Sequence, residues 1–169
     1  MPRVFAALTL PHDVCDALAR DVKTLSRFDP LARFTPSTDF HITLAFIGEV
    51  PMETALRVSA AIRPLASITP QNISLARLGL FERPRVLWVG VSPEETLQPV
   101  ATEVRKILDD MGVKYDKMPF KPHITVARNW RRPYPYATLP QRTFRLGGPI
   151  LLQSETDRRT GQVRYRQIF

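Results

Sequence analysis

"FHITLAFIG" (Phe40–Gly48) and "PHITVARNW" (Pro122–Trp130) are the most informative stretches, because a chain with three histidines writes His-Ile-Thr twice. The two copies lie 82 positions apart, at His41 and His123. In an extended strand, alternate side chains share a face. Each copy is therefore expected to be a strand with an imidazole and a hydroxyl on one face and an isoleucine on the other.

The same offset of 82 continues through much of both halves. Arg3-Val4 matches Arg85-Val86 and Pro11 matches Pro93, and the alignment needs no gap. We predict one domain over residues 1–169 with an internal repeat, approximately 3–48 and 85–130. Each half reads as a strand, a proline-started helix, a loop and a His-Ile-Thr strand. Two such lobes, related by approximate two-fold symmetry, would face each other across a cleft.

Hydrophobic periodicity predicts the remaining elements. The expected order is a strand over 4–9, a helix after Pro11, a proline-broken loop, a strand over 40–47, a helix after Pro51, strands over 72–81 and 85–91, a helix over 97–111 stopped by Gly112, a strand over 123–128, a loop over 129–140, and two tail strands within 143–155 and 162–169. This order predicts an α+β (mixed α/β) fold of two pseudo-symmetric lobes. Each lobe would be an antiparallel-rich sheet with helices packed on the outside, around a central cleft.

Composition limits the setting in which the protein works. The 169 residues carry a net charge of +8 and a pI near 10.2, which indicates either an anionic partner or simple solubility. The single Cys15 has no internal disulfide partner, so a reducing cytoplasm is expected. The short apolar N-terminus lacks the length and cleavage site of a signal peptide, and no stretch has the roughly 20 apolar residues of a membrane span. We expect a soluble cytoplasmic monomer.

The duplicated His-Thr pairs indicate acid–base chemistry on an anion. Two imidazoles across a cleft can act as general base and general acid near neutral pH. Two threonine hydroxyls can donate hydrogen bonds to the oxygens of a phosphodiester. A single histidine on a strand is commonly a core residue, but duplication at matched positions favours function. Two histidines are too few for a zinc site, so no metal and no cofactor is expected. Near-equivalence leaves open which histidine is the acid.

The motifs also resemble those of a known family. "HITL" (His41–Leu44) and "HITV" (His123–Val126) are similar to the paired HxTx motifs of the two-histidine (2H) phosphoesterases. The fit is best to the RNA 2′,3′-cyclic phosphodiesterases, also called 2′-5′ RNA ligases, and covers nearly the whole chain. "RVFAALTLP" (Arg3–Pro11) resembles the opening strand of that family, and "VLWVGV" resembles its middle strand.

The resemblance implies a role for each matched residue. His41 would be the proton donor to the leaving ribose 3′ oxygen, and His123 the proton acceptor from water, leaving a 2′-phosphate. Thr43 and Thr125 would bind the phosphate. Arg128 matches an arginine often found after the second motif, but its strand parity is opposite to that of His123. It would face away unless the strand ends or bulges there.

Aromatic residues follow the second motif and are candidates for binding a base. Trp130 and Tyr134, with Tyr136, alternate with arginines, a composition that suits stacking on single-stranded RNA. The alternative is a proline-stiffened loop whose aromatic rings cover a core edge.

The sequence thus predicts metal-independent hydrolysis of RNA 2′,3′-cyclic phosphate ends. The same site would also serve a 2′-5′ RNA ligase or phosphodiesterase, or an enzyme acting on small cyclic nucleotides. The alternative from another class is a non-enzymatic RNA-binding module.

Overall fold

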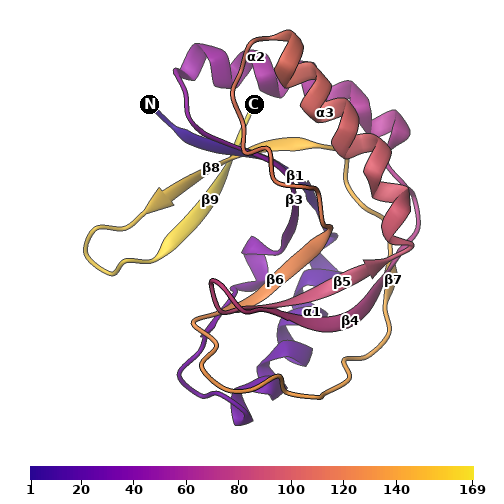
Figure 1. Cartoon of the computed structure of the whole chain (residues 1–169), viewed down its shortest axis with the longest axis vertical. Helices are drawn as coiled ribbons and strands as arrows, with labels where there is room; N and C mark the ends of the chain where they lie inside the picture. Colours follow the sequence, from indigo (N-terminus) through magenta and orange to yellow (C-terminus); the bar gives the residue numbers. More distant parts are fainter.

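Nine strands form one curled antiparallel sheet in the computed structural model, which describes all 169 residues (Figure 1). Their order is β7-β4-β5-β6-β3-β1-β8-β9, and β2 pairs with β6 off this path. The strands are β1 (Arg3–Thr9), β2 (Arg33–Phe34), β3 (His41–Glu49), β4 (Ile73–Phe81), β5 (Val86–Ser92), β6 (His123–Arg128), β7 (Thr143–Phe144), β8 (Ile150–Thr156) and β9 (Val163–Ile168). The mixed α/β fold with antiparallel pairing is confirmed.

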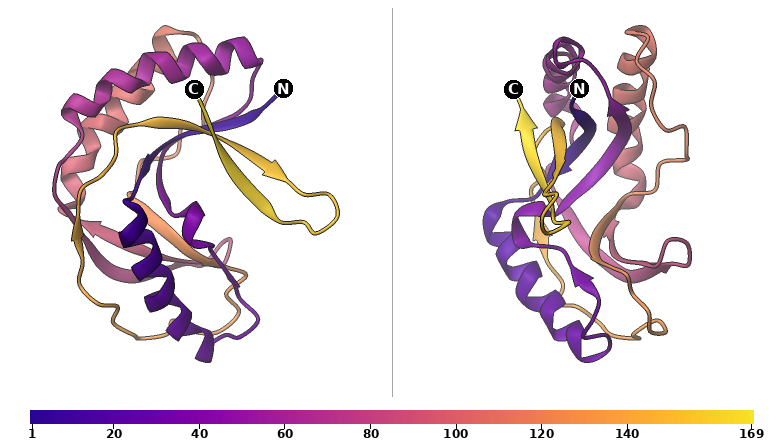
Figure 2. Two further views of the ribbon diagram at one scale, coloured as in Figure 1. Left: turned by 180° about the vertical axis from the view of Figure 1, so that it is seen from behind. Right: turned by 90° about the vertical axis from the view of Figure 1, so that its left-hand side faces the viewer.

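Three helices cover the outside of this sheet. They are α1 (His12–Lys23), α2 (Met52–Ile62) and α3 (Gln98–Asp110). Prolines start the helices as expected, with Pro11 and Pro51 at the N-caps of α1 and α2, and Gly112 follows α3 at a φ of +68°, where glycine is unstrained. Helices α2 and α3 pack together against the half that contains β3 and β8, whereas α1 lies against the β4–β5–β6 half (Figure 2).

The two halves of the sheet meet at the narrow contact between β3 and β6. Only Ile42 and Ile124 pair directly there. On one side of this contact β6 is followed by β5 and β4, and on the other side β3 is followed by β1 and β8. We propose that these two halves correspond to the repeat predicted over 3–48 and 85–130. The ungapped offset is wrong for the first strand of each half. Thr9 pairs with His41 but Gly90 pairs with His123, so the strands correspond at an offset of 81.

The tail differs from the expected single strand over 143–155. Strand β7 pairs with β4, whereas β8 pairs with β1 in the other half, and residues 145–149 cross between them. The crossing contains Gly147-Gly148, and both glycines lie close to other segments. A Cβ on Gly147 would lie 2.8 Å from the Thr9 hydroxyl, and a Cβ on Gly148 would lie 2.6 Å from the Ala66 Cβ. The β8–β9 hairpin then projects beyond the body of the sheet (Figure 1).

Trp130 belongs to the hydrophobic core, which corrects its interpretation as a base-stacking residue. None of its surface is exposed. The indole N–H donates to the carbonyl oxygen of Pro133 at 3.2 Å, and the Phe34 ring meets the indole edge-on at 6.4 Å. For Trp130 the alternative interpretation is therefore correct: its ring packs into the core and does not bind a base.

We expect Trp130→Ala to destabilise the protein by about 3–5 kcal/mol, because removal of a fully buried indole leaves a cavity that the surrounding core fills incompletely. The matched control is Tyr136→Ala in the same loop, since Tyr136 is 89% exposed, and it should change the free energy of unfolding by less than about 0.5 kcal/mol. Urea unfolding followed by circular dichroism measures both. Equal midpoints for the two variants would contradict the assignment of Trp130 to the core.

Candidate active site

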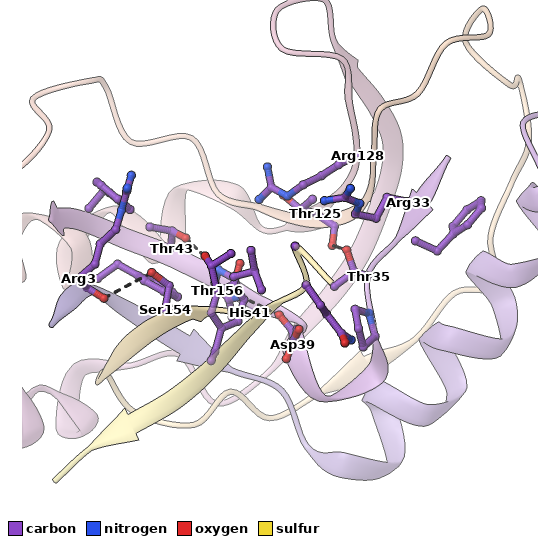
Figure 3. Close-up of a pocket in the computed structure, with 18 of the residues that line it drawn as sticks. Arg3, Arg33, Thr35, Asp39, His41, Thr43, Thr125, Arg128, Ser154 and Thr156 are labelled. Atoms are coloured by element: carbon purple, nitrogen blue, oxygen red, sulfur yellow. Dashed lines mark hydrogen bonds between the residues drawn. The ribbon is translucent and has the colours of Figure 1, made fainter. Parts of the chain in front are cut away.

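A cavity of about 710 Å³ opens on the concave side of the sheet, at the junction of its halves. His41 and Thr43 of β3 and Thr125 of β6 line it (Figure 3). His123 is not among the lining residues, but it is two positions from Thr125 on β6 and shares its partly buried face. A positive charge on His123 lowers the pKa of His41, so the two imidazoles lie within electrostatic range. The structure thus brings the two predicted His-Thr pairs together.

A β-bulge in each motif strand turns a further side chain towards the cavity. Thr125 and Ala127 pair with consecutive residues of β5, which leaves Val126 as the extra residue. Strand β3 bulges in the same way against β1. A bulge shifts the alternation of side chains by one position, so Arg128 and its counterpart Phe46 both line the cavity. Arg128 does not face away, because the strand bulges before it.

Each imidazole is fixed by its Nδ1 atom. In His41, Nδ1 donates to the carbonyl oxygen of Asp39 at 2.7 Å, and in His123 it donates to the carbonyl oxygen of Lys121, also at 2.7 Å. A carbonyl oxygen only accepts, so a neutral ring carries its proton on Nδ1 and leaves Nε2 as the free base. The Nε2 of His41 lies 3.1 Å from the Thr43 hydroxyl. Both rings therefore reserve the same nitrogen for exchanging a proton.

Aromatic rings surround both histidines. Phe5 and Tyr165 contact the ring of His41, with centroids 5.0 and 5.2 Å away. Phe81 and Trp88 contact the ring of His123, with centroids 5.0 and 6.0 Å away. Gly79 makes room for the indole of Trp88, because a Cβ at this position would clash with the ring. These rings shield part of each imidazole from water, and both histidines remain partly exposed.

Exclusion of water sets the protonation state of the free site. Burial lowers the pKa of His41 from 6.5 to about 4, and the charge of Arg128 lowers it further, against the opposing hydrogen bond to Asp39. Burial likewise lowers the pKa of His123, with the charges of Lys121 and Arg128 acting in the same direction. Both shifts therefore favour the neutral imidazole in the absence of an anion.

Charged side chains give the cavity an excess of positive charge. Arg3, Arg33 and Arg128 line it, and Asp39 is its only acidic residue. Burial raises the pKa of the Asp39 carboxyl, against the lowering effects of its hydrogen bond from Thr38 and of the charge on Arg164. Figure 3 shows the arginines spread around the cavity from β1, β2 and β6. A cavity of this charge attracts an anionic ligand.

The remaining aromatic candidates lie away from the cavity lining. The Tyr134 hydroxyl donates to the carbonyl oxygen of Leu78 at 2.9 Å, and its ring meets that of Tyr136 edge-on at 4.8 Å. A role for Tyr134 in binding substrate stays a prediction. Sequence reasoning missed the rings that contact the histidines, although Trp88 and Phe81 stand in predicted strands. It also missed Arg33, which lies in a segment read as loop.

No group of three or more His, Cys, Asp or Glu side chains is arranged to hold a metal ion. No helix combines the length and apolar character that crossing a bilayer requires.

Two His-Thr pairs on adjoining strands, beside a positively charged cavity in a curled antiparallel sheet, are the arrangement of the two-histidine phosphoesterases. A family model described as the 2′-5′ RNA ligase superfamily matches residues 11–150. The chain belongs to this superfamily.

Relatives and solved structures agree with this assignment. A protein of Geobacillus stearothermophilus named RNA 2′,3′-cyclic phosphodiesterase is 35% identical over 136 residues, covering 78% of this chain and 43% of that protein. One of the same name from Archaeoglobus fulgidus is 32% identical over 133 residues, covering 77% of this chain and 74% of that protein. The crystal structure of E. coli LigT complexed with 3′-AMP superposes with a TM-score of 0.75 at 27% identity, covering 99% of this chain and 95% of that chain.

Coverage of the relatives themselves is uneven. The match spans 43% of the Geobacillus protein and 53% of a 44% identical relative from Aeropyrum pernix. The chain thus spans about half the length of these two proteins, both named RNA 2′,3′-cyclic phosphodiesterase.

We expect the imidazole of His41 to titrate with a midpoint of about 4 in the free protein. Because the folded pKa lies below the unfolded value of 6.5, the unfolded chain binds the proton more tightly, and this group reduces stability as the pH falls below 6.5. An NMR titration of the ring carbons, assigned with His41→Asn, measures the midpoint. Adenosine 2′-phosphate should raise it, since a bound anion favours the imidazolium. A midpoint near 6.5 without ligand would contradict the dominance of burial.

Proposed function

We propose that this protein hydrolyses the 2′,3′-cyclic phosphate at the 3′ end of RNA to a 2′-phosphomonoester, using His41 and His123 as its acid–base pair. The observation that carries the proposal is the matched anchoring of the two imidazoles, each through Nδ1 to a carbonyl oxygen two residues earlier. Both leave Nε2 to exchange a proton, next to a cavity rich in arginine. The relatives named RNA 2′,3′-cyclic phosphodiesterase support the choice of substrate.

In the proposed reaction, water attacks the phosphorus while the bond from phosphorus to the ribose 3′ oxygen breaks. Nε2 of His123 accepts the proton of the water, and protonated Nε2 of His41 donates a proton to the leaving 3′ oxygen. This division of roles follows the family resemblance. The phosphate remains on the 2′ oxygen. After the reaction His123 is protonated and His41 is neutral, so a proton transfer through solvent restores the starting state of the site.

Thr43 and Thr125 are proposed to hold the phosphate. Their hydroxyls come from facing strands and line the same cavity, so they can donate hydrogen bonds to the two non-bridging oxygens. The negative charge of a bound phosphate would also explain how His41, the proposed acid, becomes protonated. His41 is neutral in the free site at pH 7 because burial lowers its pKa, and the bound phosphodiester anion favours the imidazolium that donates the proton.

We also propose that the protein acts as a cytoplasmic monomer. The buried thiol of Cys15 is the only thiol of the chain, so no internal disulfide can form, which is typical of proteins in a reducing compartment.

His41→Ala and His123→Ala should each lower kcat by about 100- to 10,000-fold, the usual contribution of a positioned general acid or base. His12→Ala, at the exposed start of α1, is the matched control and should keep full activity. The assay is hydrolysis of adenosine 2′,3′-cyclic phosphate and of an RNA oligomer with a 2′,3′-cyclic end, with the 2′ and 3′ products separated. A fully active variant at either position would refute the two-histidine mechanism.

Other outcomes of this assay favour the alternatives. Cleavage or joining of 2′-5′ linked oligomers at a higher rate would make the 2′-5′ linkage the preferred substrate, and turnover of mononucleotides alone would indicate a small cyclic nucleotide. Salt-sensitive RNA binding without any turnover would indicate a binding module.

The pH dependence of kcat/KM should be a bell whose maximum lies below pH 6.5. This parameter reports the pKa values of the free enzyme, and burial lowers those of both histidines below 6.5. The acid limb marks protonation of the base, and the alkaline limb marks loss of the proton from the acid. Initial rates at low substrate between pH 3.5 and 8.5 measure the profile. A maximum above pH 7 would contradict the proposed pair.

A further inference from the structure

The cavity is larger than the contacts of the reacting phosphate require. From His41, Thr43 and Thr125 it continues past β2 to the tip of the β8–β9 hairpin, where Thr160 and Gln162 line it. The volume of about 710 Å³ falls in the middle of the range of ligand sites, roughly 300–1,000 Å³. It therefore has room beyond the group that the histidines act on.

Two arginines line the cavity from adjoining strands. Arg33 of β2 and Arg128 of β6 are paired across the ladder, and Figure 3 shows their guanidinium groups beside Thr125. Neither takes part in any ion pair of the chain, since those involve Arg85, Lys117, Arg142 and Arg166. Like charges in directly opposed positions are destabilising. A pair that lacks any carboxylate is stabilised when an anion lies between its members.

The position of Arg33 is fixed by the short strand that carries it. Beyond Ile42 and Ile124, β3 and β6 separate, and β2 takes the vacated side of β6. The backbone N–H of Thr35 donates to the carbonyl oxygen of Val126 at 3.0 Å, and the Thr35 hydroxyl donates to that of Thr125 at 3.0 Å. Arg33 is thus held in register with the strand that bears the second His-Thr pair.

We propose that Arg33 and Arg128 form a second phosphate subsite, which binds the phosphate on the 5′ side of the terminal nucleotide. This inference rests on the proposed function, because it takes the cyclic phosphate to lie at Thr43 and Thr125. Guanidinium groups bind phosphate through two parallel hydrogen bonds. The next phosphate of an RNA strand lies one nucleotide away and cannot share the threonine pair. The substrate class is therefore RNA ends and 5′-phosphorylated nucleotides, in preference to nucleosides that carry only the cyclic phosphate.

The test compares adenosine 2′,3′-cyclic phosphate with the same compound bearing a 5′-phosphate. The wild-type protein should show kcat/KM about 10- to 100-fold higher for the 5′-phosphorylated substrate, as expected for charged hydrogen bonds. Arg33→Met should bring this ratio close to one. Arg57→Met is the matched control, since Arg57 lies exposed on α2, outside the cavity, and it should keep the wild-type ratio.

Two results would overturn the subsite. One is a wild-type ratio near one, and the other is an Arg33→Met variant that loses the same factor on both substrates, which would place Arg33 at the reacting phosphate.

A binding measurement separates this inference from the proposed reaction. Adenosine 2′,5′-bisphosphate should bind wild-type protein more tightly than adenosine 2′-phosphate, by about 10- to 100-fold in Kd at fixed ionic strength, and Arg33→Met should abolish the difference. Calorimetric titration measures all four affinities without turnover. Equal affinities in the wild-type protein would refute the subsite even if the enzyme is active, whereas a difference without turnover would refute only the proposed function.

Discussion

The contact between Ile42 and Ile124 is the constraint on which the site depends. It joins the two halves of the sheet through a single directly paired position. Because each isoleucine stands between the histidine and threonine of its own motif, pairing the isoleucines brings both His-Thr pairs to one place. Their burial on the opposite face supplies the hydrophobic free energy that holds the strands together. The same tripeptide thus provides the core contact and the functional groups.

The aromatic surroundings of the histidines serve both geometry and electrostatics. Rings such as Phe5 and Trp88 pack against the imidazoles and also shield part of each one from water. Removing water lowers the pKa of each imidazole, so the free site does not hold a pair of adjacent positive charges. An anion entering the cavity meets arginines that stay charged, and it favours the protonated form of a nearby imidazole. In the proposed reaction, binding of the substrate would therefore promote the protonation of His41 that the reaction requires.

The sequence allowed prediction of those site residues that belong to the repeated motif. His41, Thr43, His123 and Thr125 were predictable because the motif repeats and strands alternate their faces. The orientation of Arg128 was not, since it depends on a bulge that only the ladder reveals. Trp130 stands among arginines and prolines, a polar context that hides its burial. Strand β2 has two residues and no periodicity, and it exists through pairing with β6.

The repeat supplies two near-equivalent histidines, and residues outside the motif make them different. The backbone carbonyl oxygens of Asp39 and Lys121, each two residues before a histidine, accept a hydrogen bond from its Nδ1. Their side chains carry opposite charges in equivalent positions. The ammonium of Lys121 lowers the pKa of His123 and does not act on that of His41. This charge is therefore one difference between two otherwise similar imidazoles. At both histidines the main obstacle to protonation is burial, which lowers the pKa of His41 to about 4 and also lowers that of His123, and a bound anion would offset it at either ring.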